Sequence, residues 1–135
     1  MMSLDLLMHR EVETTTVDST LREVAGRMGE KKIGSLLVEK DGKIVGIVSE
    51  TDLSRKAVAH GLDPERTKVG DIMSSPIISI DVKGSAEDAN DLMKSNGVRH
   101  LVVMDGEKVA GIISVRDLLR YFKVYYDGLG SLRKS

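Results

Sequence analysis

The stretch Gly46-Ile47-Val48-Ser49-Glu50-Thr51-Asp52-Leu53 occurs again 65 positions later, as Gly111-Ile112-Ile113-Ser114-Val115-Arg116-Asp117-Leu118. Each copy begins with an apolar run rich in Ile and Val, which predicts a buried strand. A Ser follows, with an Asp three residues later, and this spacing is typical of a capping box at the start of a helix. The stretch therefore predicts a strand that ends where a helix begins, and the free N–H groups of such a junction suit a bound anion.

The repeat extends without a gap far beyond this stretch. Residues 4–60 align with residues 69–125 at the same offset, so that Leu36 corresponds to Leu101. An internal repeat constrains the fold strongly, and a single duplication is too short for a solenoid. We therefore expect a pseudo-symmetric pair that shares one core, in which Leu36 and Leu101 are buried together.

Both copies predict the order strand, helix, strand, strand, helix. Ser or Thr followed three residues later by Glu or Asp marks helix starts, and Asp-Gly marks hairpin turns. In the first copy we expect strands over 12–17, 33–38 and 44–48, a helix after Thr20, and a helix over 52–60. In the second copy we expect strands over 77–82, 98–103 and 109–113, and helices that begin after Ser85 and at Asp117. The fold class is therefore α/β, of the α+β kind.

The composition argues against several classes of protein. The net charge of −1 gives no broad basic face for nucleic acid. The chain has no cysteine, which excludes disulfides and thiolate metal sites. No apolar run has the length of a membrane span, and the N-terminal residues lack the pattern of a secretory signal. We expect a cytoplasmic protein that binds neither a membrane nor nucleic acid.

These features together resemble the CBS domain pair, also called a Bateman module. The family's repeat carries an apolar strand, then Gly-x-x-Ser/Thr-x-x-Asp, then a helix, and a short lead ending in Met precedes each copy. Here the leads are Leu4-Asp5-Leu6-Leu7-Met8 and Val69-Gly70-Asp71-Ile72-Met73. The resemblance covers nearly the whole chain, with one repeat over residues 4–62 and the other over 69–127. It implies a stand-alone pair of β-α-β-β-α repeats packed sheet to sheet.

Members of this family bind adenosine-containing ligands in two clefts between the paired repeats. The resemblance implies that the Asp of one repeat holds the ribose hydroxyls, its Ser or Thr holds phosphate, and strands of the other repeat enclose the adenine. One cleft would use Ser49, Thr51 and Asp52 with Ile78, Ser79, Ile80, Val98, Arg99, His100 and Leu101. The other would use Ser114, Arg116 and Asp117 with Thr14, Thr15, Thr16, Ile33, Gly34, Ser35 and Leu36.

The residue types also suit such a ligand on chemical grounds. A carboxylate can accept hydrogen bonds from both hydroxyls of a cis-diol. Hydroxyl groups at a helix N-terminus suit a phosphate. Gly46 and Gly111 would allow a planar base to approach the backbone closely. No cofactor is required, and we expect no metal site because the His residues are scattered along the chain.

The two predicted clefts are not equivalent. The strand that would face Asp52 carries Arg99 and His100, whereas the matching positions in the first copy are Gly34 and Ser35. In the resembling family, basic residues at this point meet the phosphates of the ligand. We therefore expect an adenine nucleotide to bind the cleft of Asp52 more tightly than the other cleft.

Other interpretations stay open. The two Ser–Asp pairs can be capping boxes with no ligand role, and the basic pair can be a solvated strand face. The chain would then be a ligand-free dimerising scaffold that regulates a separate partner protein. AMP, ADP and ATP are the expected ligands, with NAD and S-adenosylmethionine as alternatives that share the adenosine. We expect no enzyme, because the sequence offers no pairing of a nucleophile with a base.

The aromatic residues gather at one place near the C-terminus. They are Tyr121, Phe122, Tyr125 and Tyr126. One helix cannot bury all of them on a single stripe, so they either pack on their own repeat or form a partner surface, where aromatics are enriched. Because the resembling family commonly pairs modules through helices, we predict a homodimer to which Tyr121, Phe122 and Tyr125 contribute.

Overall fold

The computed structural model describes residues 3–123 of the chain. The chain divides into two compact units. The first-repeat unit comprises Val12–Ile77, and the second-repeat unit comprises the described residues before Val12 and after Ile77. Each lead therefore belongs to the unit that is built from the other repeat.

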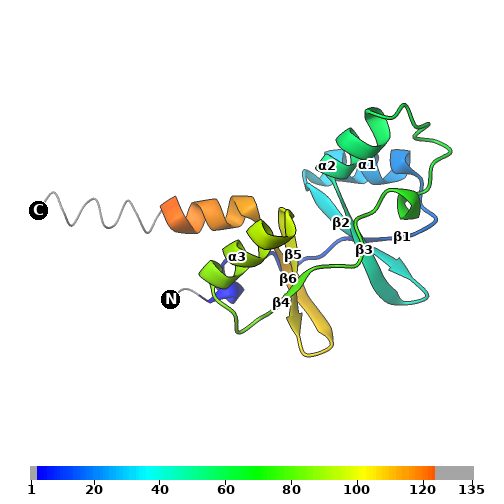
Figure 1. The fold of residues 1–135 in the computed structure, drawn as a ribbon. Coiled ribbons are helices and arrows are strands. Elements are labelled where there is room, and N and C mark those ends of the chain that lie inside the picture. The colour runs from blue at the N-terminus through cyan, green and yellow to red at the C-terminus, as the bar shows by residue number, and fades with distance from the viewer. Residues whose placement is uncertain (1–2, 124–135) are drawn as a thin grey trace, which may run out of the picture. The chain divides into compact units, whose positions relative to one another are not determined.

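The first-repeat unit has a sheet of three strands (Figure 1). The strands are β1 (Thr14–Thr16), β2 (Ser35–Lys40) and β3 (Lys43–Ser49), in the order β1-β2-β3. β1 runs parallel to β2, because α1 (Leu21–Lys31) connects them, and β3 returns antiparallel through a hairpin. After β3 the chain enters α2 (Glu50–Asp52) and continues as a π-helix over Leu53–Val58. The helix predicted over 52–60 is thus present, but it begins at Glu50 and ends at Val58, earlier at both ends than predicted.

The second-repeat unit repeats this topology. Its strands are β4 (Ser79–Asp81), β5 (His100–Asp105) and β6 (Lys108–Ser114), and its first helix is α3 (Ala86–Asn96). β4 pairs parallel with β5, and β5 pairs antiparallel with β6. Residues 115–123 are helical. The predicted α+β class with β-α-β-β-α repeats is confirmed, and the strands are displaced by only a few residues from the predicted ranges.

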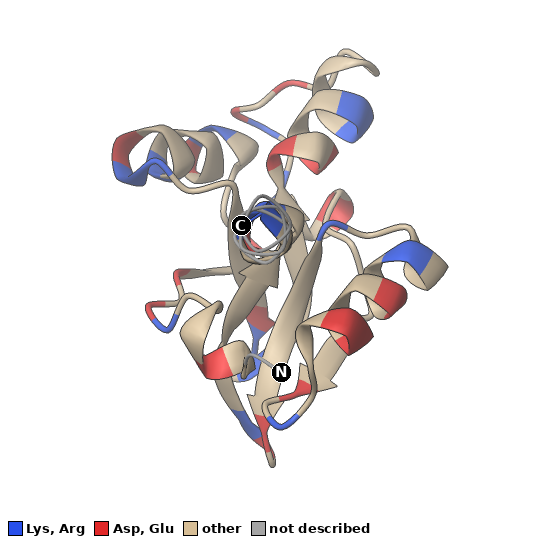
Figure 2. Ribbon diagram, turned by 90° about the vertical axis from the view of Figure 1, so that its left-hand side faces the viewer, with Lys and Arg blue, Asp and Glu red and all other residues tan. Residues whose placement is uncertain are grey.

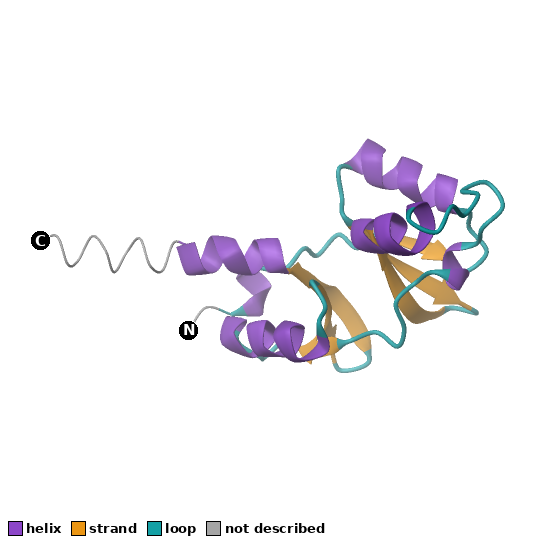
Figure 3. Cartoon of the chain, turned by 45° about the horizontal axis from the view of Figure 1, so that its top comes forward, coloured by secondary structure: helices purple, strands orange, loops and turns teal. Residues whose placement is uncertain are grey.

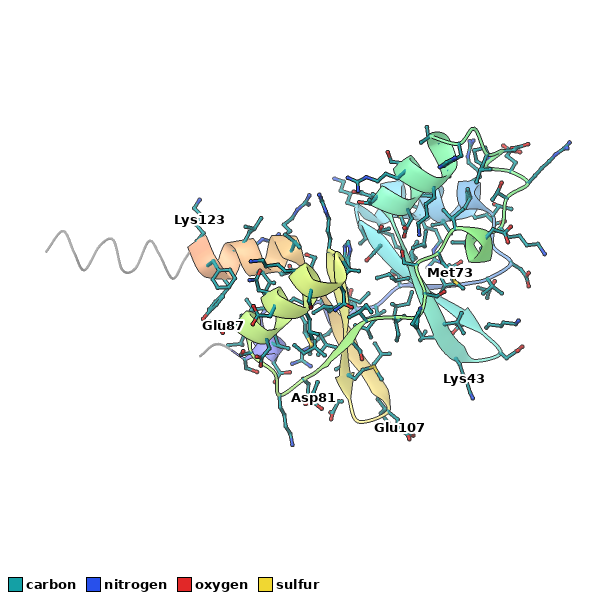
Figure 4. All side chains as sticks on the ribbon, in the orientation of Figure 1. Lys43, Met73, Asp81, Glu87, Glu107 and Lys123 are labelled. Atoms are coloured by element: carbon teal, nitrogen blue, oxygen red, sulfur yellow. The ribbon has the colours of Figure 1, made fainter. Side chains whose placement is uncertain are left out.

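The two hairpins differ in their turn residues. The first turn consists of Asp41 and Gly42, both with positive φ, as a two-residue turn of type I′ requires. The second turn consists of Gly106 and Glu107, so the Asp-Gly turn predicted there is shifted by one residue. Figure 4 shows Lys43 and Glu107 near the ends of these hairpins. Gly106, with φ 62°, takes the first position because its backbone conformation disfavours a side chain there.

Each unit buries its own core under its helices (Figure 3). In the first-repeat unit, the buried stripe of α1 packs on the sheet. That core contains Leu21, Val24, Met28, Leu36, Val38 and Val48. The corresponding core of the second-repeat unit contains Ala86, Ala89, Met93, Leu101, Val103 and Ile113. The expectation that Leu36 and Leu101 are buried together is therefore wrong, because each strand turns this residue toward the helix of its own unit.

The leads complete these cores. Each lead forms a 3-10 turn, over Leu4–Leu6 and over Val69–Asp71, and the first residue of each turn is fully buried. After the turn, His9 forms an antiparallel bridge with Ile112 of β6, and Ser74 forms one with Ile47 of β3. The residue that follows each lead therefore adds backbone hydrogen bonds to the outer strand of the sheet.

This bridging explains the glycines of the repeated stretch. A Cβ on Gly111 would lie 2.5 Å from the carbonyl oxygen of His9. A Cβ on Gly46 would lie 2.7 Å from Sδ of Met73 and 2.9 Å from the carbonyl oxygen of Ser74. Figure 4 shows Met73 beside β3. The prediction that these glycines admit a planar base is wrong, because the lead occupies the space that the missing side chain leaves.

Charges of both signs are interspersed on the helices that Figure 2 shows. This distribution agrees with the small net charge of −1. Within residues 3–123, none of the helices has the length and apolar character needed to cross a bilayer.

Candidate functional site

Asp52 closes a complete capping box at the start of α2. The backbone N–H of Asp52 donates to Ser49 Oγ over 3.2 Å, and the backbone N–H of Ser49 donates to Asp52 Oδ2 over 3.0 Å. Ser49 Oγ also donates to the same carboxylate oxygen, over 3.2 Å. Asp52 is only 6% exposed, so these bonds fix its orientation. The capping box predicted for Ser49 and Asp52 is confirmed, and Oδ1 is left for other donors.

Two donors meet at Oδ1 of Asp52. Ser74 Oγ, from the segment after the lead, donates over 3.0 Å, and Lys56 Nζ lies 3.0 Å away. Lys56 follows Asp52 by one helical turn, a spacing that favours an ion pair. The ammonium group also donates to the carbonyl oxygen of Ile72 over 3.1 Å and to Ser74 Oγ over 3.3 Å. The carboxylate of Asp52 is therefore neutralised and hydrogen-bonded inside its own unit.

Asp117 closes the same box in the second-repeat unit. Its backbone N–H donates to Ser114 Oγ over 3.2 Å, while the N–H and Oγ of Ser114 donate to Asp117 Oδ2 over 2.8 and 2.9 Å. Oδ1 lies 2.9 Å from Nε2 of His9, which acts as the donor because an ionised carboxylate only accepts. The side chain of Asp117 is 4% exposed and that of His9 is 62% exposed. This carboxylate is therefore held by a partner that solvent can reach.

The two sites are built on one plan. His9 and Ser74 occupy equivalent positions of the repeat, and each directs a side-chain donor to Oδ1 of the aspartate in its own unit. Lys56 and Tyr121 are likewise equivalent positions. Only the first-repeat unit thus has a cationic side chain at this position. Both units therefore hold the aspartate in the same way, but only the first-repeat unit places a lysine beside its carboxylate.

The other predicted site residues lie on strands of the same units. Thr14–Thr16 form β1, and Ile33–Ser35 lead into β2, both in the unit of Asp52. The carbonyl oxygen of Gly34 accepts from the backbone N–H of Glu50 over 3.0 Å. The strand therefore runs beside the start of α2.

The equivalent residues of the second-repeat unit are arranged alike. Ile78–Ile80 lead into and form most of β4, and Val98–His100 lead into β5, in the unit of Asp117. The carbonyl oxygen of Arg99 accepts from the backbone N–H of Val115 over 2.9 Å. The crosswise clefts predicted from the sequence combine residues of both units, and they stay a prediction.

Sequence reasoning missed three residues of these sites. They are His9, Lys56 and Ser74. A signal existed for Lys56, because an Asp and a Lys four residues apart on a helix attract each other. His9 and Ser74 carried a weaker signal, since both follow the Met that ends a lead.

The described residues offer no metal centre. In residues 3–123, no group of three or more His, Cys, Asp or Glu side chains is placed to hold an ion.

Comparison with known protein families agrees with this geometry. The family model of the CBS domain matches the chain twice, over residues 3–59 and 69–124. The chain belongs to the CBS domain family. Each match contains one lead, one capping-box aspartate and the strands between them. The two matches make this a CBS domain pair, of the kind that generally serves as a regulatory ligand-binding module.

Curated relatives carry the same domains in chains of different length. The uncharacterized protein MK0525 of Methanopyrus kandleri is 38% identical over 114 residues, which cover 82% of this chain and 58% of the relative. The CBS domain-containing protein YhcV of Bacillus subtilis is 30% identical over 118 residues, covering 87% of this chain and 84% of YhcV. The chain thus spans somewhat more than half of the first relative and most of the second.

Solved CBS structures share the fold. The hexameric CBS-CP12 protein from bloom-forming cyanobacteria superposes with a TM-score of 0.82 at 31% identity, covering 88% of this chain and 70% of that protein. The architecture described above is therefore that of known CBS domain pairs.

Proposed function

We propose that this CBS domain pair binds an adenine nucleotide, AMP, ADP or ATP, and that the bound nucleotide regulates a partner protein. The observation that carries the proposal is the pair of buried aspartates, Asp52 and Asp117, each with one carboxylate oxygen fixed by a capping box. The second oxygen of each already accepts a hydrogen bond from a side chain. A ribose hydroxyl is a donor of the same kind and would replace that side chain.

The phosphates of the ligand would lie near the helix starts. Ser49 and Thr51 stand at the start of α2, and Ser114 and Arg116 stand at the start of the helical residues 115–123. Arg99 is exposed and can reach a phosphate in solvent. We propose that it contacts the outer phosphates together with His100, because charge-assisted hydrogen bonds to phosphate are strong. NAD and S-adenosylmethionine would share the ribose contact, but they would differ from ATP in the groups that they offer to Arg99 and His100.

Titration calorimetry with adenosine, AMP and ATP tests the proposal. Asp52→Asn and Asp117→Asn should each weaken every ligand at one site by about ten- to a hundredfold, since all three ligands share the ribose. Asp88→Asn is the matched control, because Asp88 closes the capping box of α3 in the same way but has no predicted ligand role. Arg99→Ala should weaken ATP more than AMP and leave adenosine nearly unchanged.

Two results would contradict this function. The first is wild-type protein that binds none of the ligands, and the second is unchanged affinity in both aspartate variants. Losses for Arg99→Ala that are equal across the three ligands would remove only the phosphate role of Arg99. Similar binding in Asp52→Asn and wild type, alongside a severe loss in Asp117→Asn, would reverse the expected order of the two sites.

A second candidate is a ligand-free dimerising scaffold that regulates a separate partner protein. The cyanobacterial CBS-CP12 protein is described as hexameric, which favours an oligomer here too. In this chain Tyr121 and Phe122 are half-buried, with ring centroids 5.1 Å apart, and both pack against the core of their unit. Tyr125 and Tyr126 lie outside the described residues. We propose a homodimer, and light scattering that gives the monomer mass of 14.8 kDa would contradict it.

The two candidates can be separated by the absorbance of the purified protein. The chain has no Trp and few Tyr, so a bound adenine that copurifies would dominate the ultraviolet spectrum. A nucleotide spectrum that disappears on denaturation and filtration favours the binding module. Protein that is oligomeric, carries no ligand and binds none in calorimetry favours the scaffold.

A further inference from the structure

We propose that Lys56 makes the Asp52 site selective for phosphorylated over unphosphorylated adenosine ligands. Lys56 holds the carboxylate of Asp52 in the free protein, and a ribose must release it before binding there. The released ammonium is then available to a phosphate of the same ligand. This inference rests on the proposed nucleotide-binding function and adds a residue that the repeated Ser–Asp motif does not contain.

The geometry of Lys56 is that of a fully engaged ammonium group. A lysine has three N–H donors and no acceptor. Here the three acceptors within reach are Asp52 Oδ1 at 3.0 Å, the carbonyl oxygen of Ile72 at 3.1 Å and Ser74 Oγ at 3.3 Å. The hydroxyl group of Ser74 also donates a hydrogen bond to the same oxygen of Asp52, over 3.0 Å. The carboxylate oxygen that would receive a ribose hydroxyl is therefore occupied by a hydroxyl and a cation.

Lys56 can nevertheless leave this position. Its side chain is 46% exposed, whereas that of Asp52 is 7% exposed, so solvent reaches the lysine but hardly the aspartate. Lysine is a compact charge on a flexible stem, and it can turn from a carboxylate to a nearby phosphate without moving the backbone. The site thus has a fixed carboxylate and a movable cation.

The exchange has opposite consequences for the two kinds of ligand. Adenosine would replace the ion pair of Lys56 with Asp52 by hydrogen bonds from its uncharged hydroxyl groups, and it offers the displaced ammonium no new partner. AMP and ATP carry their own anion, so the ammonium exchanges a carboxylate for a phosphate. The ion pair that Lys56 and Asp52 form in the free protein is therefore enough to favour phosphorylated ligands. Contacts with the adenine are not needed for this selectivity.

The Asp117 site provides the internal comparison. The position equivalent to Lys56 is Tyr121, whose phenol is uncharged or anionic but never cationic. Oδ1 of Asp117 is held instead by His9, a side chain that is 62% exposed. Adenosine should therefore find less competition at Asp117 than at Asp52. The preference between the two sites should therefore change with the ligand, since adenosine favours the Asp117 site and ATP favours the Asp52 site.

Calorimetry on Lys56→Gln in an Asp117→Asn background isolates the Asp52 site. The ratio of ATP affinity to adenosine affinity is expected to fall about tenfold, because adenosine binds more tightly and ATP loses a cationic contact. Arg55→Gln is the matched control, since Arg55 precedes Lys56, is exposed, and changes the net charge equally. It should leave the ratio unchanged. Lys56→Arg, which keeps the charge, should retain most of the selectivity.

The outcomes separate this inference from the function on which it rests. An affinity ratio that is the same in Lys56→Gln and Arg55→Gln overturns the role of Lys56 while nucleotide binding stands. Absence of binding by adenosine, AMP and ATP in the wild type and in every variant overturns the proposed function, and the selectivity of Lys56 with it. A melting temperature close to that of the parent, measured on each variant, shows that the comparison is made between folded proteins.

Discussion

The two units keep the same backbone and core but differ in the polar groups around them. Each has a lead that bridges the last strand of its sheet, a glycine beneath that lead, and a capping-box aspartate. In the first-repeat unit Glu13 forms ion pairs with Arg27 and Lys31. The equivalent positions of the second-repeat unit are Ile78, Leu92 and Asn96.

This difference shows which features the duplicated fold requires. Ile78 and Leu92 pack against the core of the second-repeat unit, where the first-repeat unit has an ion pair at the surface. The features that both units share are those whose substitution would move the backbone. The features that differ between the units lie at the surface or beside the aspartate, where a substitution can give one unit a property that the other lacks.

The largest expected effect tests whether the two cores are equivalent. Leu36→Ala and Leu101→Ala should each lower the free energy of unfolding by about 2–5 kcal/mol, because each removes a fully buried side chain. Urea denaturation measures this loss. Leu119→Ala is the control, since Leu119 is 63% exposed and its loss should stay within about 0.5 kcal/mol. A small loss for only one of the two core variants would show that the cores are not equivalent.

The next effect tests the glycines beneath the leads. Gly111→Ala should cost about 1–3 kcal/mol, because the new Cβ would meet the backbone carbonyl of His9 at 2.5 Å. Gly46→Ala should cost less, since its nearest contact is the flexible side chain of Met73 and its backbone contact, with the Ser74 carbonyl oxygen, is longer at 2.9 Å. Urea denaturation of both variants shows which substitution lowers the free energy of unfolding more.

A third glycine serves as the control for this pair. Gly29 lies in α1, and a Cβ added there would meet no other atom within 4 Å, so Gly29→Ala should stabilise the protein by about 0.5–1 kcal/mol. A loss for Gly46→Ala that exceeds the loss for Gly111→Ala would contradict this order, and would show that contacts with Met73 and the Ser74 carbonyl together cost more than the closer contact with His9.

The sequence predicted most of the fold because the duplication repeats its strongest local signals. Strand runs, helix caps and the Ser–Asp boxes each depend on residues close in sequence, and all of them appear in the structure. The exchange of leads was not predicted, because a lead carries no mark of the sheet that it will join. The role of Gly46 and Gly111 was misread for the same reason, since the group that fills their space comes from a distant segment.

The candidate site was predicted in part. Ser49 with Asp52 and Ser114 with Asp117 lie together, as their spacing within each motif requires. The donors at the second carboxylate oxygen include His9 and Ser74, which directly follow the leads and could not be found without knowing where the leads pack. The predicted clefts combine strand residues that are still farther apart in the sequence, and their placement around a ligand stays a prediction.

The smallest expected effect concerns the ion pairs that only the first-repeat unit has. Lys31 and Arg27 donate hydrogen bonds to the carboxylate of Glu13, over 2.9 and 2.6 Å. These bonds, first that of Lys31 and then that of Arg27, lower the pKa of Glu13 from its ordinary value of 4.5. Because the folded-state pKa is the lower one, the stabilisation is fully present above the ordinary pKa of glutamate and is lost as the pH falls through the folded-state value.

Thermal melts of wild type and Glu13→Gln at a series of pH values measure this contribution. At neutral pH the variant should melt lower by no more than about 3 °C, because ion pairs that solvent can partly reach contribute little. The difference should shrink below about pH 4.5 and vanish in stronger acid, where Glu13 of the wild type is protonated as well. Glu30→Gln is the control, as Glu30 is an exposed residue of the same helix as Arg27. A difference that persists unchanged in acid would mean that Glu13 stabilises the unit through hydrogen bonds that the amide of Gln does not reproduce, and not by its charge.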